Sequence, residues 1–322
     1  MADDPRIAEM AALPESFRAP LAVFAGAKPP APAWFDAALA DPPERRMILV
    51  EGANIELLTW GEIGKPGLLL LHGNGAHADW WSFVAPMLAK DYRVAALSWS
   101  GMGGSDWRQT YTGAVFAQEI FAAMAAAKLE ADGQKPIVIG HSFGGFPLMY
   151  CAARHPERLR AAILLDSSVQ PPDKRWRGPP PRGPANRVYA SLEEALGRFR
   201  LAPPQGCENL YIADYIARTS LKAAPLEDGS GQGWTWKFDP QMWGKFAMED
   251  LGGLLKDMTC PVALMWGERS GLMGEETLTY MLTQVPPATR LVAIPDADHH
   301  VMIDQPLAFI GAVRGLLAGW DI

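Results

Sequence analysis

The stretch that decides the fold is Ile137-Val138-Ile139-Gly140-His141-Ser142-Phe143-Gly144-Gly145. Its first three residues are β-branched and apolar, which is typical of a strand that is buried on both faces of a parallel sheet. A Gly-x-Ser-x-Gly motif at Gly140, Ser142 and Gly144 follows at once, and a helical pattern then runs as far as Pro156. We therefore expect a tight strand-to-helix turn that lifts the Ser142 hydroxyl above the sheet, beside the N-terminus of a helix.

Strands and helices alternate on both sides of this stretch. Strand patterns occur at 45–51, 55–62, 68–71, 94–99, 137–139, 161–165, 262–266 and 291–294. Helices are expected at 78–90, 113–129, 275–282 and 307–317, and from the Ser142 turn to residue 155. The alternation predicts an α/β fold, with a mostly parallel eight-stranded sheet covered by helices on both faces.

Residues 169–250 interrupt this alternation, because they contain many prolines and several tryptophans but no buried apolar run. A segment of this length is expected to hold helices and to carry function. We expect a helical cap inserted after strand 6, which divides the core into residues 45–168 and 251–322. Residues 1–44 are rich in Ala and Pro, and we expect them to lie on another surface, either a face of the core or a second subunit of a homo-oligomer.

A serine hydroxyl is a poor nucleophile unless a base takes its proton. The loop after the last predicted strand carries Asp298-His299-His300. The downstream spacing, with Asp304 and Pro306 following His299, favours His299 as the base and leaves His300 facing elsewhere.

Several motifs together carry a resemblance to a known family. They are His72-Gly73, Gly101-Met102-Gly103-Gly104-Ser105, the glycine-rich turn at 140–145, and the segment from His299 to Pro306. With these motifs, residues 45–322 resemble the α/β-hydrolase superfamily, in particular its capped serine-esterase branch, which is related to C–C hydrolases, haloalkane dehalogenases and epoxide hydrolases. The resemblance implies Ser142 as the nucleophile and His299 as the base, with no metal and no organic cofactor.

The resemblance also implies an oxyanion hole. His72-Gly73-Asn74-Gly75 follows the strand at 68–71, where the family places the first oxyanion turn. The backbone N–H of Asn74 would then pair with that of Phe143 to hold the tetrahedral oxyanion. We expect His72 to brace the turn rather than to take part in catalysis.

The acid of the triad departs from the commoner pattern in the family. The usual position, a few residues after the strand at 262–266, holds Ser270, which cannot orient an imidazole by charge. Some relatives place the acid at the end of the strand before the cap, and Asp166 lies there. We favour Asp166, with Glu268 as the main alternative and Asp298, Glu275 or no acid also open.

A serine at the turn favours acyl transfer, because the related dehalogenases and epoxide hydrolases use a carboxylate there. Aromatic residues and a methionine are expected to line an apolar pocket. They are Trp81, Trp99, Met102, Trp234 and Trp236. The expected activity is that of a carboxylesterase, which cleaves a small, largely apolar carboxylic ester through an acyl-enzyme. Cleavage of a C–C bond, lactone or amide by the same triad remains open, as does a hydrolase-like receptor without turnover.

The composition limits the partners and the compartment. The net charge of -7 disfavours nucleic acid and an anionic membrane surface. The chain shows no signal-peptide core, and its three cysteines have no metal-ligand spacing. We therefore expect a cytoplasmic protein that acts on a small-molecule ester.

Overall fold

The computed structural model describes residues 11–174 and 183–320, and its centre is an eight-stranded sheet in the order β1-β2-β4-β3-β6-β7-β11-β12. The sheet strands are β1 (Glu44–Val50), β2 (Ala53–Trp60), β3 (Gly67–Leu71), β4 (Arg93–Leu97), β6 (Ile137–His141), β7 (Ala161–Leu165), β11 (Val262–Gly267) and β12 (Arg290–Ile294). The strands from β4 to β12 in this order pair in parallel, whereas β2 pairs antiparallel with both β1 and β4. The predicted fold class is therefore confirmed.

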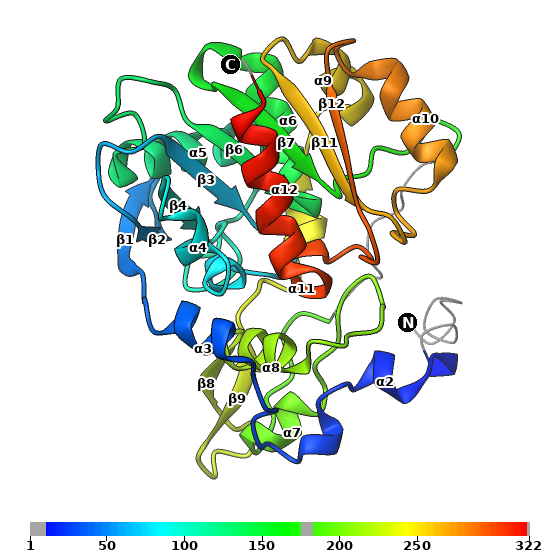
Figure 1. Ribbon diagram of the computed structural model, residues 1–322. Coiled ribbons are helices and arrows are strands. Elements are labelled where there is room, and N and C mark those ends of the chain that lie inside the picture. Colours follow the sequence, from blue (N-terminus) through cyan, green and yellow to red (C-terminus); the bar gives the residue numbers. More distant parts are fainter. Residues whose placement is uncertain (1–10, 175–182, 321–322) are drawn as a thin grey trace.

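Helices cover both faces of the sheet (Figure 1). Each face of the sheet carries its own hydrophobic cluster. In strand β3, Leu68 and Leu70 belong to the first cluster, and Leu69 and Leu71 belong to the second. The first cluster includes residues of α4 (Ala85–Leu88), α11 (Val301–Asp304) and α12 (Pro306–Ala318). The second includes residues of α5 (Gly113–Ala127), α6 (Gly145–Arg154), α9 (Leu251–Asp257) and α10 (Glu275–Gln284). Side chains alternate across a strand, so a strand covered on both faces is apolar throughout.

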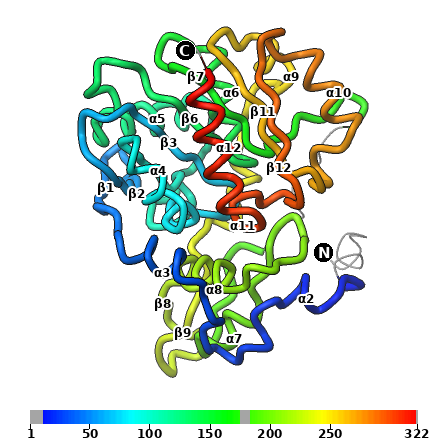
Figure 2. The backbone as a smooth tube through the Cα atoms, viewed as in Figure 1, coloured from blue at the N-terminus to red at the C-terminus, as the bar shows by residue number. Residues whose placement is uncertain are grey.

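The segment at 183–250, which precedes α9 in the chain, lies mostly with the N-terminal segment at one end of the core (Figures 1 and 2). It contains α7 (Leu192–Leu196), α8 (Leu210–Thr219), and the 3-10 helix η5 (Met242–Lys245). It also contains an antiparallel pair, β8 (Leu221–Pro225) and β9 (Gln232–Trp236), which the expected helical cap did not include. The pattern concealed these strands because both are partly exposed and neither is a continuous apolar run. A short strand, β10 (Phe246–Ala247), pairs with β5 (Tyr111–Thr112) of the core.

The N-terminal segment lies on the cap and on the adjoining core of its own chain. It contains α2 (Glu15–Arg18), η1 (Ala22–Phe24) and α3 (Ala33–Leu39). The ring of Phe35 in α3 is 4.9 Å from that of Tyr211 in α8 and 6.0 Å from that of Phe83 in the core. Arg218 of α8 donates to the carbonyl of Gly26 at 2.7 Å. The segment thus contacts both parts of its own subunit. Within the described ranges, no helix is long and apolar enough to cross a bilayer.

Candidate active site

Ser142 occupies a strained turn between β6 and α6. Its φ is 52°, a left-handed value that is uncommon for a residue with a side chain. The neighbouring glycines allow this turn, because a Cβ on Gly140 would lie 2.6 Å from the carbonyl oxygen of Gly144. A Cβ on Gly144 would lie 2.7 Å from the carbonyl oxygen of His72. Ser142 itself is half-buried, so its hydroxyl is presented above the sheet at the start of the following helix.

His299 lies on the loop after β12 and faces Ser142. Its Nε2 is 2.9 Å from Ser142 Oγ, although the two residues are 157 positions apart. The backbone carbonyl of His299 accepts a hydrogen bond from Nε2 of His141 at 3.0 Å, which fixes the loop against the end of β6. The geometry therefore pairs the predicted base with the predicted nucleophile.

Asp166 follows β7 and completes a hydrogen-bond chain. Its Oδ1 is 2.7 Å from His299 Nδ1, and its side chain is fully buried. Ser270 Oγ donates to Oδ1 at 2.7 Å, and the backbone N–H of Gly267 donates to Oδ2 at 2.9 Å. Glu268, the alternative acid, has an exposed side chain. The carboxylate accepts the Nδ1 proton of the imidazole, so Nε2 is left with a lone pair toward Ser142.

The turn that follows β3 lies beside Ser142. A Cβ on Gly73 would lie 3.2 Å from Ser142 Cβ, which is tighter than an ordinary van der Waals contact, so a glycine favours this close approach of the turn. His72 braces it, because Nδ1 donates to the carbonyl of Gly73 at 2.8 Å while Nε2 accepts from the backbone N–H of Trp99 at 3.0 Å. Burial lowers the pKa of His72 to about 3, so the ring is neutral at pH 7. In the described part of the chain, the backbone N–H groups of Asn74 and Phe143 donate to no protein group.

Comparison with known proteins agrees with this geometry. The sequence pattern of the family described as alpha/beta hydrolase fold matches residues 66–306. The chain belongs to the α/β-hydrolase family. Its curated relatives include esterase Rv0045c of Mycobacterium tuberculosis, which is 25% identical over 279 residues, covering 83% of this chain and 88% of that protein. A pimeloyl-[acyl-carrier protein] methyl ester esterase of Chromobacterium violaceum is 27% identical over 256 residues, covering 77% and 92% of the two chains.

Solved structures show the same α/β-hydrolase fold. The thioesterase domain from the curacin biosynthetic pathway has a TM-score of 0.68 at 21% identity, over 84% of this chain and 99% of that one. The M. tuberculosis esterase Rv0045c has a TM-score of 0.61 at 21% identity, over 95% of this chain and 99% of that one. The family match and the esterase relatives support an enzyme of the α/β-hydrolase type.

The second histidine of the loop, His300, faces the cap of the hydrolase. Its Nδ1 is 2.6 Å from Oε1 of Gln205, and the same oxygen accepts from the His300 backbone N–H at 3.0 Å. Burial, followed by the neighbouring rings of His299 and His141, lowers the pKa of His300 well below its usual value. Gln205 also donates to Asp304 at 2.9 Å, so one cap side chain links both ends of α11. Sequence analysis missed Gln205, because nothing in an irregular segment indicates a partner 95 residues away.

The predicted pocket residues of the hydrolase divide into two groups. Trp99 and Met102 lie by the active-site turns, since the Trp99 ring is 6.5 Å from that of Phe143 and Met102 Sδ accepts from the Gly75 N–H. The contacts of the other three lie in the core and in the cap. Trp81 is fully buried against Phe309 of α12, Trp236 contacts Tyr189 and Phe199 within the cap, and the Trp234 backbone pairs with Tyr189. These three tryptophans pack the core and the cap.

A different pair of cap aromatics reaches the active site. The ring of Phe143 is 5.5 Å from that of Trp243 and 5.4 Å from that of Phe246. The Phe146 ring also lies 5.8 Å from that of Phe143. Trp243 also donates its indole N–H to Asn74 Oδ1 at 3.2 Å. The sequence places Trp243 among the tryptophans of residues 169–250 but does not distinguish it from the others, because pairings between distant segments, such as β10 with β5, bring this part of the cap to the core.

Proposed function

We propose that this hydrolase is a serine esterase that cleaves a small, largely apolar carboxylic ester through an acyl-enzyme. The proposal depends on one observation, the continuous hydrogen-bond chain from Ser142 Oγ through His299 to the buried carboxylate of Asp166. A nucleophile, a base within reach of it, and a third group that orients the base are the minimum for acyl transfer by a serine.

In the first half of the reaction, Ser142 Oγ attacks the ester carbonyl carbon while His299 Nε2 takes the hydroxyl proton. Asp166 holds the ring and stabilises its positive charge. The N–H groups of Asn74 and Phe143 donate to the oxyanion that forms. Collapse of this intermediate breaks the carbon–oxygen bond, and the alcohol leaves with the proton from His299. Water then attacks the acyl-enzyme, His299 takes its proton, and the proton returns to Ser142 Oγ as the acid departs.

The surroundings of the nucleophile favour an apolar substrate. Phe143 follows Ser142 directly, and rings of Phe146, Trp243 and Phe246 lie around it. Aromatic walls of this kind bind alkyl and aryl groups better than charged ones. The curated relatives include esterases that act on methyl esters, which agrees with a carboxylic ester as the substrate class.

A serine-directed fluorophosphonate probe and a panel of p-nitrophenyl esters test the proposal. We expect the probe to label Ser142, and Ser142→Ala to lose both labelling and more than about 99% of ester turnover, since the triad acts as a unit. Ser16→Ala, which changes an exposed serine in α2, is the matched control and should behave as wild type. Absent labelling and absent turnover in the folded wild type would favour a ligand-binding protein instead. Faster cleavage of amides, lactones or a C–C bond would mean that the substrate class is not a simple ester.

A further inference from the structure

We infer that Trp243 of the cap is a positioning residue for the oxyanion hole, an inference that rests on the proposed esterase function. The residue lies in η5 and contacts the two residues whose backbone N–H groups are assigned to the oxyanion. Its indole Nε1 donates to Asn74 Oδ1 at 3.2 Å. Its ring meets that of Phe143 edge to face, with the centroids 5.5 Å apart and the planes at 82°.

The backbone around Trp243 is fixed to the core. Asp239, which is 5% exposed, donates its N–H to the carbonyl of Gly101 at 2.7 Å. Its Oδ2 accepts from the Tyr111 hydroxyl at 2.8 Å and from Lys245 Nζ at 2.9 Å. Strand β10 then pairs with β5 immediately after η5. Because η5 is held on both sides, the indole of Trp243 provides a fixed donor for the Asn74 side chain.

The oxyanion turn has little internal support of its own. Its one backbone bond within 73–76 is from Ala76 N–H to the Gly73 carbonyl at 3.3 Å, and Gly75 has a φ of 69°. External contacts hold the rest, since Gly75 N–H donates to Met102 Sδ and Asn74 Oδ1 accepts from Trp243. The orientation of the Asn74 peptide therefore depends on the contacts that Met102 and Trp243 make with the turn.

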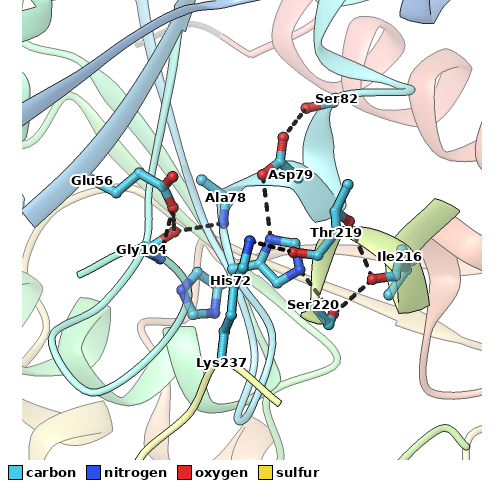
Figure 3. A network of polar contacts seen from close by, with 12 residues as sticks. Glu56, His72, Ala78, Asp79, Ser82, Gly104, Ile216, Thr219, Ser220 and Lys237 are labelled. Atoms are coloured by element: carbon cyan, nitrogen blue, oxygen red, sulfur yellow. Dashed lines mark hydrogen bonds and ion pairs between the residues drawn. The ribbon is translucent and has the colours of Figure 1, made fainter. Parts of the chain in front are cut away.

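The cap also holds the far end of this turn. His77 Nε2 is 2.9 Å from Ser220 Oγ in the cap, and His77 Nδ1 is 3.5 Å from Asp79 Oδ2. Figure 3 shows Asp79 on the core side and Ser220 on the cap side of this buried network. The segment from Asn74 to His77 is thus fixed to the cap at both ends, with Trp243 nearer the reacting atoms.

This arrangement predicts a specific loss when the indole N–H is removed. Trp243→Phe keeps an aromatic ring beside Phe143 but has no donor for Asn74. Asn74→Ala keeps the backbone N–H but removes the acceptor. Loss of one oxyanion donor costs about 10²–10³ in kcat, and a misoriented donor costs less, so we expect each change to lower kcat about tenfold. We expect KM to change less than about twofold, because the interaction strengthens in the transition state.

A double-mutant cycle tests whether the two residues act through one bond. The combined Asn74→Ala and Trp243→Phe protein should lose no more than either single variant, because both changes remove the same hydrogen bond. Inactivation by a fluorophosphonate, whose reaction passes through a charged oxygen in the same hole, should slow in proportion to kcat. Trp34→Phe is the matched control, since the Trp34 ring packs on Tyr211 of α8. Thermal unfolding of all variants separates a change in stability from a change in rate.

The outcomes separate the two proposals. Unchanged kcat in both single variants, in an enzyme whose Ser142→Ala form is inactive, overturns the role of Trp243 and leaves the esterase intact. Additive losses in the double variant also overturn it, because they would mean two independent effects. Retained activity in Ser142→Ala overturns the esterase proposal itself. If Trp243→Phe does not fold, the Asn74→Ala variant still decides whether the Asn74 side chain matters.

Discussion

Replacing Asp166 by Asn tests the hydrogen-bond chain at its most buried member. The carboxylate accepts from His299 Nδ1 at 2.7 Å, from Ser270 Oγ at 2.7 Å, and from the Gly267 N–H at 2.9 Å. An amide has one oxygen and one NH₂ group, so it cannot accept on both sides. If its oxygen stays on Gly267, its NH₂ group faces His299 Nδ1 and selects the tautomer that carries its proton on Nε2.

That tautomer presents an N–H to Ser142 and cannot take the serine proton. The corresponding change in a serine protease lowers kcat by about 10⁴, which corresponds to about 5.5 kcal/mol of transition-state stabilisation. Since the imidazole here has the same two contacts, we expect Asp166→Asn to lower kcat by about 10³–10⁴. The assay is steady-state hydrolysis of a p-nitrophenyl ester, with circular dichroism and thermal unfolding to verify that the variant is folded.

Two further variants make this result interpretable. Glu268→Gln changes an exposed side chain and should stay within about twofold of wild type. Ser270→Asp in the Asp166→Asn background should recover part of the loss, because Ser270 Oγ lies 2.7 Å from Asp166 Oδ1. More than about a tenth of wild-type kcat in Asp166→Asn would refute the reasoning and leave Asp166 as a structural acceptor for Gly267.

Other predictions concern the histidines and the cap. His299→Ala should be as damaging as loss of the nucleophile, whereas His300→Ala should keep most activity in the same ester assay and lower the melting temperature, because its ring contacts Gln205. Because burial lowers the pKa of His72 to about 3 from an unfolded value near 6.5, the folded state disfavours its proton, so its contribution to stability is present above pH 6.5 and lost as the pH falls toward 3. Urea unfolding from pH 7 to pH 4 should show this decline in the free energy of unfolding. His72→Gln should remove the part of the decline that comes from one proton, which is at most about 1.4 kcal/mol per pH unit. Phe246→Ala should shift the ranking in an ester panel toward bulkier acyl groups, because the ring lies 5.4 Å from Phe143, and an unchanged ranking would leave Phe246 as cap packing only.

Local sequence patterns were sufficient for the core and for the turn at Ser142. The Gly140 to Gly145 motif predicted the turn because a strand pattern ends directly before it and a helical pattern begins directly after it. Its glycines meet backbone or a small side chain at close range. The choice of Asp166 came from the resemblance to relatives that place the acid at the end of the strand before the cap, with Glu268 left open as the main alternative. The hydrogen bond of Asp166 to His299 falls within the range of about 2.6–3.2 Å expected for such a pair.

The cap could not be predicted to the same depth. Trp234 and Trp243 have similar sequence surroundings, but β9 pairs within the cap while η5 leads into the strand that joins the core. Which tryptophan reaches Phe143 is therefore set by chain pairing over more than a hundred residues. Gln205 illustrates the same limit, because its partners on the His300 loop are distant in the chain and its own segment has no periodic pattern.

The position of Ser270 suggests how the acid that contacts the histidine could move in evolution from the end of one strand to the end of its neighbour, with the sheet unchanged. β7 and β11 are parallel neighbours, so the residues that follow their carboxyl ends lie close together. Here Ser270 Oγ lies 2.7 Å from Asp166 Oδ1. A lineage that carried carboxylates at both positions would have two acids sharing a proton, because like charges this close cannot both ionise. One ionised carboxylate would still face His299 at every step. Adjacent strands thus give this fold a continuous route between two arrangements of the same triad, in which no ancestor needs to lose its acid.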